Sequence, residues 1–371
     1  MAPATRSSPV WSACTTIFDY PASISSQREA GGGIGQPGLF IDEIPCTAPR
    51  LYMAAGVTTL RTTGSVEPYA DLKVKHRIDA GLMPGPSIDA TAPYLEGKGT
   101  PFAQMTELGG PEAARRFVDY WAAEGMTSFK AYMNIGPEEL AAAIAQAHTH
   151  GMKLTGHLCS VSWPEAIAAG IDVLEHGPLF SDTEFVADRK PGVCASYRAL
   201  TESWQKFEKA DPRVQRLIAD LVSHYVAVTS TLPVFEASVM GRPPIQRRVL
   251  EAMSPSARES CFTARAAVSS VGSAAAMPEA TLRKELEFER AFALTGGLLL
   301  AGPDPTGNGG VLPGFGNQRE VELLVEAGFT PVEAIHIATQ NGARYPGRED
   351  QVGTIAPGWR ADSVRGQVGI R

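Results

Sequence analysis

The fold is decided by residues 152–177, which read MKLTGHLCSVSWPEAIAAGIDVLEHG. This stretch opens with a short apolar run that ends at His157 and closes with a second run that ends at His176. Between the two runs, Pro164–Ala169 has the composition of a helix, with Pro near its start and Gly170 just past its end. Strand, helix and strand in this order predict a parallel β-α-β unit.

The same alternation extends from about residue 50 to residue 345. Further apolar, β-branched runs that we expect to form strands are Val57–Arg61, Thr127–Tyr132, Tyr225–Leu232 and Gly297–Asp304. Helix-like segments such as Pro111–Glu124 and Pro137–His150 separate them. So many units in one α/β chain favour a (β/α)8 TIM barrel over an open sheet. A nucleotide-binding sheet is disfavoured because no GxGxxG or GxxxxGK[ST] motif follows any run.

Composition and net charge limit the kinds of partner that we expect the protein to bind. The 371 residues are 44% hydrophobic and 20% charged, which is typical of a globular protein. The formal net charge of −7 offers no basic surface for a nucleic acid. We also find no run of about 20 apolar residues that could span a membrane, and no apolar signal-peptide segment at the start. We therefore expect a cytoplasmic protein that acts on a small molecule, without a nucleic-acid or membrane partner; a homo-oligomer stays open.

The five cysteines are odd in number and scattered, and none forms a CxxC pair. This distribution argues against a disulfide framework and against a thiolate zinc site. We expect these cysteines to act as small apolar residues in a reducing compartment.

Polar residues occupy the ends of four predicted strands. His157 and His176 end the two runs of the opening stretch, Lys130 lies near the end of another, and Asp304 follows the run that begins at Gly297. The carboxyl ends of barrel strands form the face on which barrel enzymes build their active sites. Two imidazoles and a carboxylate beside a buried lysine suit a divalent metal ion. A lone histidine at a strand end is more often a structural residue, but four polar residues at matching positions favour a site.

Several longer stretches resemble the metal-dependent amidohydrolase superfamily, with the imidazolonepropionase-like or prolidase-like branch as the nearest. The matching stretches are AAGVTTLRTTGS (54–65), SFKAYM (128–133), residues 156–177, AGPDPTG (301–307) and the segment 327–362, which contains AGFTPVEAIHIATQNGARYPG and VGTIAPGWRAD. The resemblance covers about residues 47–362. It implies a TIM barrel with a small flanking β-sandwich, and two divalent metal ions that activate a bridging hydroxide.

The resemblance also implies roles for individual residues. Lys130 would be the carboxylated lysine that bridges the metals, His157 and His176 would bind the second metal, and Asp304 would bind the first metal and carry the proton. Tyr132, two residues after Lys130, would face the substrate, with packing inside the barrel as an equal alternative. The metal would be zinc, or else Mn, Fe or Co, since all accept these ligands.

The sequence departs from the family pattern near its start. The family has a His-x-His motif on its first strand, but here no histidine precedes His76. Codons for Ser8–Ile17, read in an alternate frame, can encode Pro-Gly-Leu-Val-Gly-Met-His-Asp-His. We therefore hypothesise that residues 1 to about 16 are translated out of frame, and we expect one metal ion instead of two.

Three regions follow from this comparison. Residues 1–46 are expected to be irregular, without a convincing barrel strand, and residues 47–350 to form the barrel, with a helical excursion at 190–290. Residues 351–371 would be a remnant of a β-sandwich that is largely truncated at both ends.

The predicted function is hydrolysis of an amide or cyclic-amide C–N bond by a metal-activated hydroxide. One alternative is a phosphotriester or lactone hydrolase on the same metal centre, because the surrounding loops select the substrate. The other alternative is a catalytically impaired remnant that binds a single metal.

Overall fold

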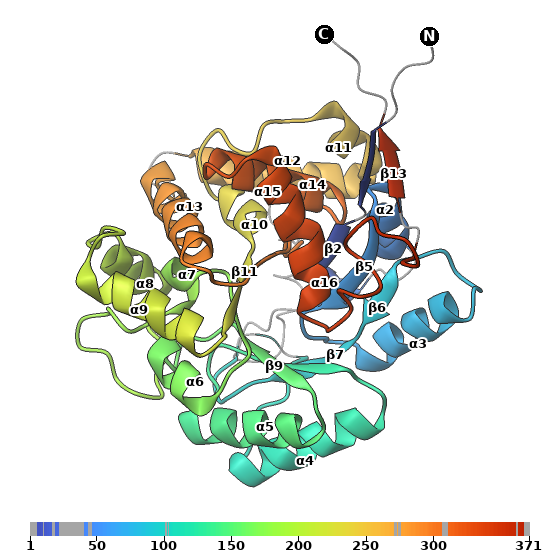
Figure 1. The fold of residues 1–371 in the computed structure, drawn as a ribbon. Helices are drawn as coiled ribbons and strands as arrows, with labels where there is room; N and C mark the ends of the chain where they lie inside the picture. The colour runs from blue at the N-terminus through green and yellow to red at the C-terminus, as the bar shows by residue number, and fades with distance from the viewer. Residues whose placement is uncertain are drawn as a thin grey trace, which may run out of the picture.

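We describe the protein from a computed structural model (Figure 1). The structure describes residues 47–360 except 101, 103, 271, 272, 274, 275 and 306–310. It also describes the backbone of strands at 6–9, 11–16, 19–21, 41–43 and 363–366.

Parallel strands form the centre of the fold. Their order around the barrel is β2 (Trp11–Thr16), β5 (Val57–Thr62), β6 (Ser87–Asp89) with β7 (Thr91–Leu95), β8 (Ser128–Ala131), β9 (Lys153–Gly156), β10 (Val173–Glu175), β11 (Ala227–Ser230) and β12 (Leu299–Ala301). The short strands β6 and β7 are separated only by Ala90, and they pair with β5 and β8 respectively, so they occupy one position. β12 lies against β2, which brings the two ends of the strand series together. The predicted (β/α)8 fold class is confirmed.

The first barrel strand was not expected. We predicted no barrel strand before residue 50, and this is wrong, because β2 pairs in parallel with β5 from Trp11↔Val57 to Thr16↔Thr62. The sequence of β2, WSACTT, lacks the aliphatic residues that marked the other strands. β2 occupies the first position of the barrel because β5 and β12 lie on either side of it, and not because of its own composition. The His-x-His motif expected near this position is absent from the sequence of β2.

Two antiparallel ribbons lie outside this series. β1 (Arg6–Pro9) pairs with β13 (Ser363–Gly366), and β3 (Asp19–Pro21) pairs with β4 (Ile41–Glu43). Figure 1 shows the β1–β13 ribbon at one edge of the molecule, outside the barrel strands.

Helices surround the strands (Figure 1). Those that follow successive strands are α2 (Ala48–Ala54), α3 (Pro68–Asp79), α4 (Pro111–Ala123), α5 (Pro137–Thr149), α6 (Trp163–Ala169), α9 (Pro212–Ser223), α13 (Glu279–Leu294), α14 (Phe315–Glu326) and α15 (Pro331–His336), with the π-helix η1 (Ile337–Asn341) and α16 (Gly342–Arg344) continuing α15. The predicted start and stop signals of α6 are confirmed: Pro164 lies in its first turn, and Gly170 caps it with a left-handed φ of 89°. None of the described helices is long and apolar enough to cross a membrane.

The helical region at 190–290 is not a single excursion. β11 and the barrel helices α9 and α13 fall within it. The additional helices, including one just before it, are α7 (Pro178–Ser181), α8 (Tyr197–Trp204), α10 (Leu232–Glu236), α11 (Arg247–Ala252) and α12 (Pro255–Ser269). The added helices therefore belong to the loops that follow β10 and β11, at the carboxyl ends of these strands.

The expectation that every cysteine acts as a small apolar residue is wrong for two of them. Cys159 and Cys194 form a disulfide with their Cα atoms 4.7 Å apart. They are 35 residues apart in the sequence, and the fold brings the loop after β9 against the segment after α7. Cys261 is a buried free cysteine, as expected.

Substitution of Trp163, at the start of α6, would test the packing of the core. Its side chain is fully buried, and its Nε1 donates a hydrogen bond to Ser181 Oγ at 3.2 Å. We expect Trp163→Ala to lower the free energy of unfolding by about 3–5 kcal/mol, because it leaves a large cavity. Urea unfolding would measure the loss. Leu82→Ala, at a side chain that is 69% exposed, is the control and should change stability by less than about 0.5 kcal/mol. Equal losses in both variants would contradict the assigned burial.

Candidate active site

The four polar residues predicted at strand ends lie at the same end of the barrel. Lys130 lies in β8, His157 and His176 directly follow β9 and β10, and Asp304 lies three residues after β12. β8, β9 and β10 are neighbours in the sheet. The carboxyl ends of parallel strands point the same way, so the fold gathers these residues at one face.

The two histidines and Asp304 are in close proximity. The ring centroids of His157 and His176 are 4.4 Å apart. His176 Nδ1 lies 3.7 Å from Asp304 Oδ2 and 2.9 Å from Thr231 Oγ1, with which it forms a hydrogen bond. Thr231 therefore orients the imidazole and leaves Nε2 as the other ring nitrogen for a ligand.

The backbone is unusual at two of these positions. His176 has a φ of 73° and Asp304 a φ of 43°, so both lie in the left-handed region. Non-glycine residues rarely adopt this conformation, and such strain often accompanies functional sites. At both positions the backbone turns sharply where the strand ends.

Lys130 carries a buried amine. Its side chain is 2% exposed, and burial lowers the pKa of its amine, whereas the nearby carboxylates of Glu175 and Asp304 oppose that shift. The environment therefore favours the neutral amine more than water does.

Glu175 and Arg61 form a buried ion pair beneath these residues. Arg61 Nη2 lies 3.0 Å from Glu175 Oε1, and the side chains are 3% and 0% exposed. Thr155 donates a further hydrogen bond to the same oxygen. Burial opposes ionisation of Glu175, but Arg61 and Lys130 together hold its pKa at about 2. Glu175 is therefore a carboxylate at neutral pH.

Sequence reasoning did not assign Glu175 or Arg61 to the site. Arg61 ends the predicted run Val57–Arg61, so the strand-end argument that selected Lys130 could also have selected Arg61. Glu175 precedes His176, but nothing in its local sequence reveals a partner 114 residues away.

Desolvation shifts the pKa values of the other site residues. It lowers the pKa of His157 to about 3, with a further contribution from Lys130, and it lowers the pKa of His176 well below the usual range. Burial raises the pKa of Asp304 to about 6, while Lys130 opposes this shift. Both imidazoles are therefore neutral at physiological pH, which is the form that binds metals.

Tyr132 joins an aromatic group beside the histidines. Its ring centroid lies 5.1 Å from that of His157, 4.9 Å from Tyr94 and 6.1 Å from Phe102. The side chain is partly buried. Tyr132 therefore contacts a site residue directly and also packs within this group.

The donor set suits a divalent cation, but it does not form a complete site. Asp304 Oδ1 is buried without a hydrogen-bond partner among the described residues, as expected of an atom reserved for a ligand. Imidazole and carboxylate are ligands that zinc and related ions accept. Over the described part of the chain, however, no three His, Cys, Asp or Glu side chains are grouped closely enough to hold a metal ion.

A second group of acidic side chains lies behind the site. Ser230, at the end of β11, donates to Glu289 Oε2 at 2.7 Å and lies 2.5 Å from Glu320 Oε1. Glu285, one turn before Glu289 on α13, accepts a hydrogen bond from the Leu179 backbone at 3.3 Å. These three carboxyl groups are buried, and in the described structure none forms an ion pair. Burial raises the pKa of Glu289 to about 8.

Comparisons with known proteins agree with the fold. The sequence model of the amidohydrolase family matches residues 309–364. No curated protein matches the sequence significantly. Among solved structures, a Bifidobacterium longum protein assigned as a prolidase has a TM-score of 0.60 at 22% identity, covering 96% of this chain and 74% of that one.

Two further structures are similar over most of the chain. A Xaa-Pro dipeptidase with methionine bound in its active site has a TM-score of 0.62 at 17% identity, covering 98% of this chain and 82% of its own. A bottromycin amidohydrolase has a TM-score of 0.63 at 22% identity, covering 93% and 69%. The likeness establishes the shared barrel fold. The family match agrees with the resemblance seen in the sequence over residues 309–364.

The Arg61–Glu175 pair should contribute strongly to stability. Arg61→Met would remove the ion-pair partner of a fully buried carboxylate and leave only Lys130 as a nearby cation, so we expect the free energy of unfolding to fall by about 3–5 kcal/mol. Arg198→Met is the matched control: Arg198 is 85% exposed and pairs with Glu202 at 2.6 Å, so its loss should have no measurable effect. Urea unfolding of both variants would compare them. An unchanged Arg61 variant would contradict the importance of the pair.

The acidic group predicts a dependence of stability on pH. Glu289 ionises near its usual pKa of 4.5 in the unfolded chain but only at about 8 in the folded protein. Stability is therefore greatest below pH 4.5 as far as this group is concerned, and it falls as the pH rises toward 8.

Glu289→Gln should remove part of this pH-dependent loss of stability. At pH 8 we expect the variant to have lost about 2 kcal/mol less of its free energy of unfolding than the wild type. Unfolding in urea at pH 5 and pH 8 would measure it. The control is Glu279→Gln on the same helix, where the side chain is 59% exposed, and this change should leave the pH dependence intact. A decline that persists fully in the Glu289 variant would refute the assignment.

Proposed function

We propose that this chain, an enzyme of the amidohydrolase type, hydrolyses an amide or cyclic-amide C–N bond with the help of a bound divalent metal ion. The observation that carries the proposal is the meeting of Lys130, His157, His176 and Asp304 at the carboxyl ends of the barrel strands. Xaa-Pro dipeptidase and amidohydrolase activities are named for similar structures, so dipeptides and cyclic amides are the substrates to test first.

The proposed metal ligands are His157, His176 and the carboxylated amine of Lys130. Carboxylation requires a neutral amine, and burial of Lys130 favours that form. A bound divalent ion lowers the pKa of a coordinated water and polarises a substrate carbonyl. Zinc is our first candidate, with Mn, Fe and Co as alternatives, because all bind imidazole and carboxylate oxygen.

Asp304 is the proposed proton carrier. Its Oδ1 atom is buried and has no hydrogen-bond partner among the described residues, and its Oδ2 faces His176. With a pKa raised to about 6 by burial, the side chain can take up a proton at Oδ1 and return it to the leaving nitrogen. Thr231 fixes the ring of His176 during these steps.

Tyr132 is the proposed substrate contact. Its ring lies against His157 and packs on Tyr94. An aromatic wall beside the metal ligands would orient an apolar part of the substrate and exclude water from it. The phosphotriester or lactone alternative uses the same centre and differs only in the reacting group.

A catalytically impaired remnant is the second candidate, and a specific observation favours it. No histidine precedes His76, so β2 cannot supply the imidazole pair expected on the first strand. The proposed centre would therefore hold one metal ion. The frame-shift hypothesis stays a prediction that sequencing of the coding DNA would test, and a cytoplasmic location is likewise still a prediction.

Metal content and hydrolysis test the proposal together. We expect the purified chain, reconstituted with Zn²⁺ or Mn²⁺, to bind about one equivalent and to hydrolyse members of a panel of dipeptides and cyclic amides. His157→Ala and His176→Ala should each lower kcat/KM by at least about 100-fold, because loss of a mere supporting partner already costs 10–100-fold.

The matched control is His148→Ala, at a histidine that is 44% exposed and lies on α5 away from the strand ends. This variant should keep both metal and activity. Hydrolysis that survives in the His176 variant would overturn the proposed centre, whereas bound metal without turnover in the wild type would favour the remnant.

A further inference from the structure

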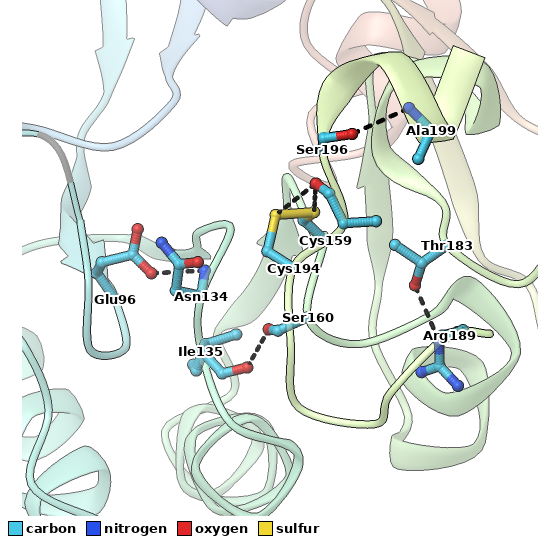
Figure 2. Close-up of a disulfide and its surroundings, with 11 residues drawn as sticks. Glu96, Asn134, Ile135, Cys159, Ser160, Thr183, Arg189, Cys194, Ser196 and Ala199 are labelled. Atoms are coloured by element: carbon cyan, nitrogen blue, oxygen red, sulfur yellow. Dashed lines mark hydrogen bonds between the residues drawn. A yellow bond between two sulfur atoms is a disulfide. The ribbon is translucent and has the colours of Figure 1, made fainter. Parts of the chain in front are cut away.

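The Cys159–Cys194 disulfide lies beside the candidate site. Cys159 is two residues after His157, in the loop that follows β9. Cys159 is buried, and Cys194 lies at the end of the segment that runs from α7 toward α8 (Figure 2). The disulfide thus fastens the loop that carries a proposed metal ligand to the segment between α7 and α8.

Hydrogen bonds on one side of Cys159 connect this loop to the loop after β8. The backbone N–H of Ser160 donates to Met133 O at 2.9 Å, and Ser160 Oγ donates to Ile135 O at 2.6 Å (Figure 2). The N–H of His157 donates to Ala131 O at 3.1 Å. The position of the His157 loop is therefore coupled to the segment that follows Lys130.

The contacts extend to a third loop. Asn134, in the turn after Tyr132, donates its backbone N–H to Glu96 Oε1 at 2.7 Å (Figure 2). Glu96 directly follows β7 and is fully buried. Three neighbouring barrel loops are thus connected through one continuous set of bonds.

Among the described residues, the segment between α7 and α8 has few other bonds to the His157 loop. The N–H of Gly192 donates to Ser160 O at 3.1 Å. Arg189 forms an ion pair with Glu165 and a hydrogen bond to Thr183 Oγ1 at 3.0 Å. Most of residues 187–193 are exposed, so the disulfide is the covalent member of a small set of fastenings.

We propose that the Cys159–Cys194 disulfide is a redox-dependent positioning element for His157. A dithiol reductant would supply two electrons and two protons, the S–S bond would break, and two thiols would form while the reductant becomes a disulfide. The segment between α7 and α8 would then be joined to Ser160 only by the Gly192 hydrogen bond, and the His157 loop would be held mainly by its hydrogen bonds to the loop after β8. The effect of disulfide reduction on turnover rests on the proposed function, but the effect of reduction on the position of the His157 loop does not.

Hydrogen exchange of the intact protein tests the positioning directly. Dithiothreitol should increase the exchange rates of the His157, Ser160 and Gly192 amides at least about tenfold, because each depends on the fastened loop. The matched internal control is the His176 amide, which donates to Thr229 O at 3.0 Å and lies in the same site. We expect this amide to change less than about twofold.

Two outcomes would overturn the proposal. One is a non-reduced digest in which mass mapping finds no Cys159–Cys194 linked peptide. The other is equal acceleration of all four amides, because it would show that the disulfide stabilises the whole fold without positioning this loop.

Cysteine variants distinguish the effect of reducing this disulfide from any effect of the free thiol of Cys261. The Co²⁺ affinity of the wild type should fall at least about tenfold on reduction and recover on reoxidation. Cys159→Ser/Cys194→Ser should have the low affinity without reductant and show no response to it. Cys261→Ser, at the buried free cysteine, should respond as the wild type does. A double variant with wild-type Co²⁺ affinity and amide exchange would refute the positioning role, even if no substrate is ever found.

Discussion

The candidate site depends on the compensation of charge inside a barrel that excludes water. Glu175 carries its negative charge in full burial because Arg61 and Lys130 lie close to it. Removing either charge would leave an ion in a medium of low polarity, which is costly. Lys130 can balance Glu175 only while its amine carries a positive charge. In the carboxylated form proposed for metal binding it would be an anion, and Arg61 would then be the counter-ion of Glu175.

The sequence predicted this arrangement where local patterns carry the information. Apolar runs mark β8, β9, β10 and β12, and the polar residue that ends each run falls on the carboxyl face, so Lys130, His157, His176 and Asp304 could be placed together. Pro164 and Gly170 likewise bound the helix between β9 and β10. These features follow from short-range periodicity and backbone preference.

The features that could not be predicted depend on distant contacts. β2 contains none of the Val, Ile or Leu residues that mark most of the other barrel strands, and its place in the barrel follows from β5 and β12 beside it. The partner of Glu175 is 114 residues away, and the two joined cysteines are separated by 35 residues with no motif between them. Charge pairing and disulfide pairing require the folded chain, and one sequence does not contain that information in its local pattern.

The left-handed backbone at His176 and Asp304 has an evolutionary consequence. Glycine and asparagine adopt this conformation at little or no cost. A codon change to either would therefore preserve the turn at the strand end while removing the imidazole or the carboxylate. A single substitution could therefore remove the chemistry and keep the barrel fold. Descendants of this chain could then retain the fold for another use.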